Sequence, residues 1–101
     1  MSAEQSQLAA LTAQIVQMHQ EMEYWTRQLQ HAQTQLQAAQ FRSGQYTRHG
    51  QNPDPFIVVA VNNHSVACNQ IQQNMAVLLN RKAAAEVEHA RLSRLVTRRG
   101  F

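Results

Sequence analysis

The stretch that decides the fold lies near the N-terminus, where residues 8–39 read LAALTAQIVQMHQEMEYWTRQLQHAQTQLQAA. Its apolar residues recur at alternating spacings of three and four, and they are Leu8, Leu11, Ile15, Met18, Met22, Trp25, Leu29, Ala32, Leu36 and Ala39. A repeat of 3.5 residues gives a helix one continuous seam that another helix must bury. The stretch therefore predicts a long coiled-coil helix.

The first helix is expected over about residues 2–42, because Ser2 and Gln5 fit a capping box and neither Pro nor Gly occurs before Gly44. Ser43-Gly44 and the prolines of Asn52-Pro53-Asp54-Pro55 predict a connector over 43–64. Within it, residues 56–61 (FIVVAV) are rich in β-branched side chains and favour a short strand. The alternative is a helix that starts near Pro55 with Asp54 as its N-cap.

A second helix is expected over about residues 65–97. Its stripe consists of Cys68, Ile71, Met75 and either Leu78 or Leu79, and it then leaves strict heptads for Ala83, Val87, Ala90 and Leu92, Leu95 or Val96. Gln and Thr dominate the positions that flank the first seam, whereas parallel zippers use charged residues there. The sequence therefore predicts an all-α fold, an antiparallel helical hairpin. Its expected register sets Met18 against Ala90 and Leu36 against Ile71.

At 101 residues the chain is expected to form a single domain, residues 1–101. A two-helix core of this size is marginal without disulfides, ligands or association. We therefore expect a homo-oligomer, most simply a dimeric four-helix bundle, or a complex with another helical protein. Further apolar residues lie off the main seam and would form a second contact face; they are Val16, Tyr24, Phe41, Val66 and Val77.

No motif names a reaction. Cys68 is the single cysteine, so no intrachain disulfide framework exists, and the five histidines lack zinc-ligand spacing. Glu86-x-x-His89, with His19 and Glu23 nearby in the hairpin, is the one arrangement that resembles a metal site, and a solvated helix face explains it better. We expect no enzyme activity, no metal and no cofactor. No signal peptide or membrane span is evident, so a cytoplasmic location is expected.

The positive charge gathers at the C-terminal end. Residues 65–101 hold six Lys and Arg against two Glu, and four of these form the candidate interaction residues Arg91, Arg94, Arg98 and Arg99. Such a basic end would bind nucleic-acid phosphates or complement the negative C-terminus of the helix. A second candidate cluster, for a small anionic ligand, lies in the 42–52 loop and consists of Arg42, Tyr46, Arg48 and His49.

The function predicted from these features is a non-enzymatic protein–protein interaction module, a scaffold, adaptor, small chaperone or inhibitor. Small chains without catalytic motifs are common among bacterial and phage accessory proteins, and we expect this chain to be of that kind. Its expected partners are its own copies or another helical protein. A basic oligomeric nucleic-acid binder and an oligomer that binds a small anion are the two alternatives.

Overall fold

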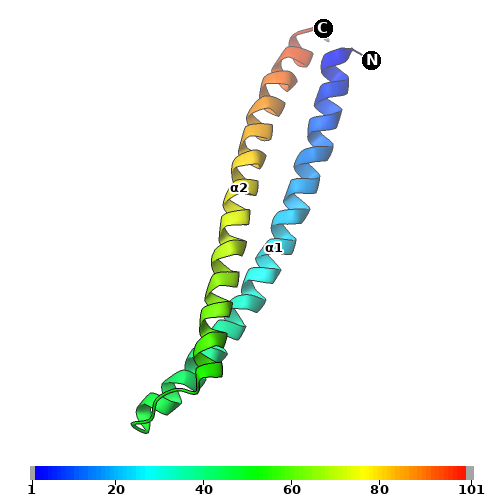
Figure 1. Cartoon of the computed structure of the whole chain (residues 1–101). Coiled ribbons are helices and arrows are strands. Elements are labelled where there is room, and N and C mark those ends of the chain that lie inside the picture. Colours follow the sequence, from blue (N-terminus) through cyan, green and yellow to red (C-terminus); the bar gives the residue numbers. More distant parts are fainter. Residues whose placement is uncertain (1, 100–101) are drawn as a thin grey trace. The chain divides into compact units, whose positions relative to one another are not determined.

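The computed structural model describes residues 2–99, and these residues form two helices (Figure 1). Helix α1 spans Ala3–Arg48 (46 residues) and helix α2 spans Pro55–Arg99 (45 residues). No strand occurs among the described residues. The predicted all-α class is confirmed, and the predicted strand over 56–61 is wrong, because these residues form the first turns of α2.

The chain divides into two compact units. Among the described residues, unit 1 comprises residues 2–24 and 75–99, and unit 2 comprises residues 25–74. Unit 2 is a helix–turn–helix hairpin, in which the chain reverses direction between α1 and α2. In unit 1 the start of α1 and the end of α2 lie at the same end, so these two segments are antiparallel (Figure 1). That the chain is a single domain stays a prediction.

The start of α1 is fixed by the predicted capping box. The Ser2 amide donates a hydrogen bond to Gln5 Oε1 at 3.1 Å, and the Gln5 amide donates one to Ser2 Oγ at 3.2 Å. The two side chains thus satisfy amides that have no partner within the helix.

The end of α1 lies beyond the predicted stop. Gly44 is accommodated inside the helix, where glycine costs only about 1 kcal/mol relative to alanine. The helix ends instead at Arg48, two residues before Gly50, which has a φ of 69°. The Gln51 amide bonds the Tyr46 carbonyl at 2.9 Å and the Gly50 amide bonds the Thr47 carbonyl at 3.0 Å, which is the pattern of a Schellman motif.

Helix α2 begins at Pro55 with Asp54 as its N-cap, which was the alternative to the predicted strand. Asp54 Oδ1 accepts a hydrogen bond from the Phe56 amide at 2.9 Å, and the Asp54 carbonyl accepts one from the Val58 amide at 3.2 Å. Pro55 occupies the first helical position, where its missing amide costs nothing. A complete N-cap outweighs the small helix penalty of the β-branched residues that follow.

The residues of the seam predicted for α1 share a similar level of burial. All ten of its residues from Leu8 to Ala39 are half-buried or buried, and Ala39 is the most enclosed at 6% exposed. The same spacing continues in both directions, to half-buried Glu4 before it and to half-buried Ser43 and Tyr46 after it. The seam therefore runs through almost the whole of α1.

The seam of α2 differs from the prediction in its second half. It keeps strict heptads, and its members there are Leu78, Lys82, Ala85, His89, Leu92 and Val96, all half-buried or buried. Of the two leucines predicted as alternatives, Leu78 is 7% exposed and lies in the seam, whereas Leu79 is 54% exposed. The predicted drift to Ala83, Val87 and Ala90 is wrong as well, because these three residues are exposed.

The register also differs from the prediction. In unit 1, Thr12 Oγ1 lies 3.0 Å from His89 Nε2, whereas the predicted alignment would bring Thr12 opposite Val96. The predicted pairing of Met18 with Ala90 is therefore wrong by about one heptad. The connector also differs from the prediction, because it spans only residues 49–54 instead of 43–64. A shift of about one heptad keeps the same seam positions inward while changing their partners.

Candidate interaction surfaces

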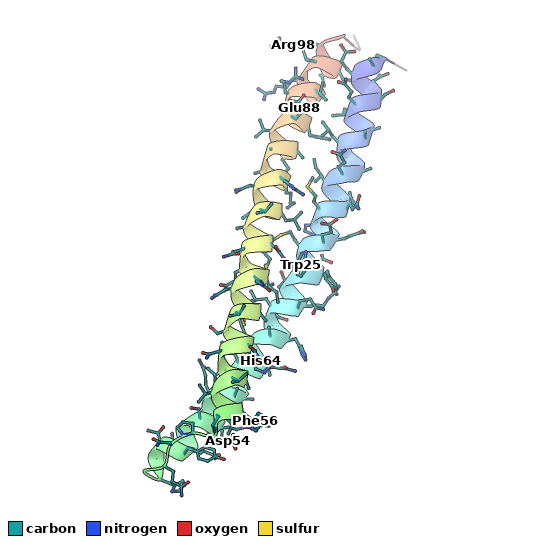
Figure 2. The ribbon with its side chains drawn as sticks, in the orientation of Figure 1. Trp25, Asp54, Phe56, His64, Glu88 and Arg98 are labelled. Atoms are coloured by element: carbon teal, nitrogen blue, oxygen red, sulfur yellow. The ribbon has the colours of Figure 1, made fainter. Side chains whose placement is uncertain are left out.

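The predicted arginine cluster lies on the last turns of α2, in unit 1. Arg91, Arg94 and Arg98 surround a hollow of about 260 Å³ whose apolar member is Leu95. All three arginines are exposed, and Figure 2 shows Arg98 near the end of the helix. The structure therefore brings three of the four predicted arginines together. Arg99 is the last residue of α2, and its side chain lies outside the described residues.

One arginine of this cluster already has an anionic partner. Arg91 Nε donates a hydrogen bond to Glu88 Oε2 at 3.0 Å, and Arg91 Nη2 donates one to Glu88 Oε1. This bidentate pairing lowers the pKa of Glu88 and raises that of Arg91, because each charge stabilises the other. Arg94 Nε donates to the Ala90 carbonyl at 3.3 Å, which complements the C-terminal end of the helix.

The second predicted cluster is not a loop. Arg42, Tyr46 and Arg48 belong to α1, and only His49 lies in the turn that follows. Tyr46 continues the seam and is half-buried, whereas Arg42, Arg48 and His49 are exposed. The four side chains therefore do not form the predicted loop surface.

Arg42 instead borders a hollow within unit 2. The hollow measures about 330 Å³ and its polar members are Gln35, Arg42 and His64. Its apolar members are the alanines at positions 38, 39 and 60. His64, which Figure 2 labels on α2, is half-buried at a seam position. Arg42 therefore borders the same hollow as a residue that the predicted cluster did not contain.

A polar contact also interrupts the seam in unit 1. Thr12 Oγ1 donates a hydrogen bond to the Leu8 carbonyl at 2.9 Å and also lies 3.0 Å from His89 Nε2. Within residues 2–99, no three His, Cys, Asp or Glu side chains gather in a way that would hold a metal ion.

Large apolar side chains remain exposed on both helices. In α1 they are Val16, Tyr24 and Phe41, each from 49 to 61% exposed, and their spacing scatters them over different faces. In α2 the most exposed is Phe56, at 85%, which the strand prediction had placed in a buried segment. Figure 2 shows Phe56 at the start of α2 beside the turn.

The exposed residues of α2 form a second heptad series, which we call the outer stripe. Its apolar members are Phe56, Val59, Val66, Val77, Ala84 and Val87. Its amide members, at the intervening heptad positions, are Asn63, Gln70, Gln73 and Asn80. All ten are exposed, and their spacings alternate between three and four without a break.

Sequence reasoning detected only part of this surface. Val66 and Val77 were expected on a second contact face, but they were grouped with residues of α1. The outer stripe is hidden from an apolar pattern search because four of its members are amides. The signal that reveals it is the heptad spacing itself, followed through Asn and Gln.

Comparison with known proteins finds no matching family, no similar curated protein and no similar solved structure. Neither helix, over its described residues, is apolar over a long enough stretch to cross a membrane. The functional argument therefore depends on the surfaces of the chain itself.

Proposed function

We propose that this chain is a non-enzymatic helical interaction module that associates with its own copies or with another helical protein. In that role it would serve as a scaffold, adaptor, small chaperone or inhibitor. One observation carries the proposal. Among the described residues, only Ala39, Cys68, Leu78 and Leu92 are buried, while ten larger apolar side chains are from 43 to 85% exposed.

The physical reason is the balance between burial and conformational entropy. Each ordered residue costs about 1–2 kcal/mol of backbone entropy, and apolar burial returns about 25 cal/mol per Å². Four buried residues give a thin core for two helices of 46 and 45 residues. Association that covers the exposed apolar side chains would add the missing stabilisation.

The proposal is tested by the mass of the purified protein in solution, measured by light scattering over a range of concentrations. A self-associating module has at least twice the chain mass of 11.5 kDa. A module that needs a different helical protein stays at the chain mass and gains helix content when that protein is added. A fully helical chain of 11.5 kDa that captures no helical partner would contradict the proposal.

A second candidate function is nucleic-acid binding through the arginine cluster. It is favoured by the grouping of Arg91, Arg94 and Arg98 around one hollow. Binding to duplex DNA or RNA, measured by fluorescence anisotropy at two salt concentrations, tests it, because phosphate contacts weaken steeply with salt. The variant R94Q/R98Q should lose that binding and keep its helix content.

A further inference from the structure

The outer stripe of α2 reads the same in both chain directions. Matched from its ends inward, the pairs are Phe56 with Val87, Val59 with Ala84, Asn63 with Asn80, Val66 with Val77 and Gln70 with Gln73. Every apolar residue is matched by an apolar residue and every amide by an amide. This pattern is what a helix needs in order to pack against a reversed copy of itself.

We propose that two copies of the chain dock through their outer stripes, with the two α2 helices antiparallel. This proposal deepens the proposed function, on which it rests, by naming the partner and the surface. A two-fold symmetric contact uses the same patch on both copies, so residue i meets residue j and j meets i. The half of the stripe in unit 2 of one copy thereby meets the half in unit 1 of the other.

The amides favour a second copy over an unrelated apolar partner. A buried amide that lacks a hydrogen-bond partner costs about 1–3 kcal/mol, so an apolar surface would leave the amides of the stripe unsatisfied. Asn and Gln each carry both a donor and an acceptor, so they can bond to one another. In the reversed copy, Asn63 meets Asn80 and Gln70 meets Gln73.

Charge decides between the two possible directions. Arg91, Arg94 and Arg98 continue the spacing of the stripe after Val87, and all are exposed. A parallel pair would set each arginine against its own copy, and like charges in contact are destabilising. The antiparallel pair separates the two clusters, so that neither arginine cluster meets its own copy.

Size and flanking residues agree with this direction. The antiparallel pair sets the largest member, Phe56, against the smaller Val87, whereas a parallel pair would set Phe56 against Phe56 and leave Ala84 against Ala84. Residues 55–80 contain no Asp, Glu, Lys or Arg, so eight of the ten stripe positions can approach another helix without desolvating a charge.

Disulfide cross-linking tests both the surface and the direction. Val66→Cys and Val77→Cys are made separately in a Cys68→Ala background, so that each protein carries one thiol. The proteins are oxidised with copper phenanthroline, each alone and as an equal mixture. The antiparallel contact predicts a cross-linked dimer that forms at least tenfold faster in the mixture than in either protein alone. Either protein cross-linking equally fast by itself would overturn the antiparallel direction, and no cross-link at all would overturn the docking surface.

A second measurement avoids the change at Cys68. Val66→Asp buries a charge in the proposed contact, and Leu79→Asp is its matched control, because both side chains are 54% exposed and Leu79 lies off the stripe. Light scattering should show the mass of Val66→Asp falling to 11.5 kDa while Leu79→Asp keeps the wild-type mass. If the wild type is oligomeric and both variants remain so, the outer stripe is not the interface, although the proposed function stands.

Discussion

Replacing Leu78 or Leu79 with alanine gives a direct test of the seam of α2. The two leucines are neighbours in one helix and the substitution is the same, so the change in helix propensity is the same. They differ in exposure, which is 7% for Leu78 and 54% for Leu79. The structure therefore predicts a large cost at the first position and a small cost at the second.

The magnitudes follow from the carbon atoms removed. Leucine to alanine deletes three carbons, worth about 0.8 kcal/mol each when fully buried, and a residual cavity adds to this. We expect Leu78→Ala to lower the free energy of unfolding by about 2–3 kcal/mol. Less than half of the surface of Leu79 is buried, so Leu79→Ala should cost about 1 kcal/mol or less. A difference of about 1–2 kcal/mol corresponds to roughly 5- to 30-fold in the unfolding equilibrium constant.

Urea unfolding followed by far-ultraviolet circular dichroism measures both values. Wild type and variants are compared at one protein concentration, because association makes stability concentration-dependent. Equal slopes against urea would show that the same surface is exposed on unfolding in each case. A Leu79→Ala cost equal to or larger than that of Leu78→Ala would refute the strict heptad seam and place Leu79 in the seam instead of Leu78.

Two further predictions concern the helix end and the ion pair. Asp54→Ala removes the N-cap of α2 and should cost about 1 kcal/mol in urea unfolding, whereas Asp54→Asn, which keeps the acceptor, should cost far less; equal losses would exclude the cap as the cause. Because Arg91 lowers the pKa of Glu88 from 4.5 in the folded state, this carboxylate contributes stability above its unfolded pKa and loses it as the pH falls through the folded pKa. The urea midpoint should therefore drop on acidification below about pH 4.5, and the drop should be smaller in Glu88→Gln; an identical pH profile would show that this pair adds nothing to stability.

The sequence was sufficient to predict α1, because Leu8 to Ala39 form an unbroken repeat whose period only a helix satisfies. It was less informative around the turn, where local signals conflict. Gly44 reads as a stop but lies inside the helix, since the seam continues at Ser43 and Tyr46. Residues 56–61 have strand propensity, but the Asp54 cap and the heptad spacing outweigh it.

The surfaces were harder to predict for a related reason. A search for apolar residues skips Lys82 and His89, which occupy seam positions while their polar atoms find partners. That search therefore assigned Ala83 and Val87 to the seam, although both residues are exposed. Arg42 was assigned to a loop, and its proximity to His64 depends on the register, which residue spacing alone does not determine.

The short turn at Gly50 has a consequence for how this chain can change length. A seven-residue repeat looks alike after every sliding step of seven, so the two helices alone would fit together in several alignments. The turn removes that ambiguity, because it fixes the residue at which the chain reverses direction. Whole heptads can therefore be deleted from both helices together and the remaining partners still meet, whereas a deletion in one helix shifts every partner beyond it.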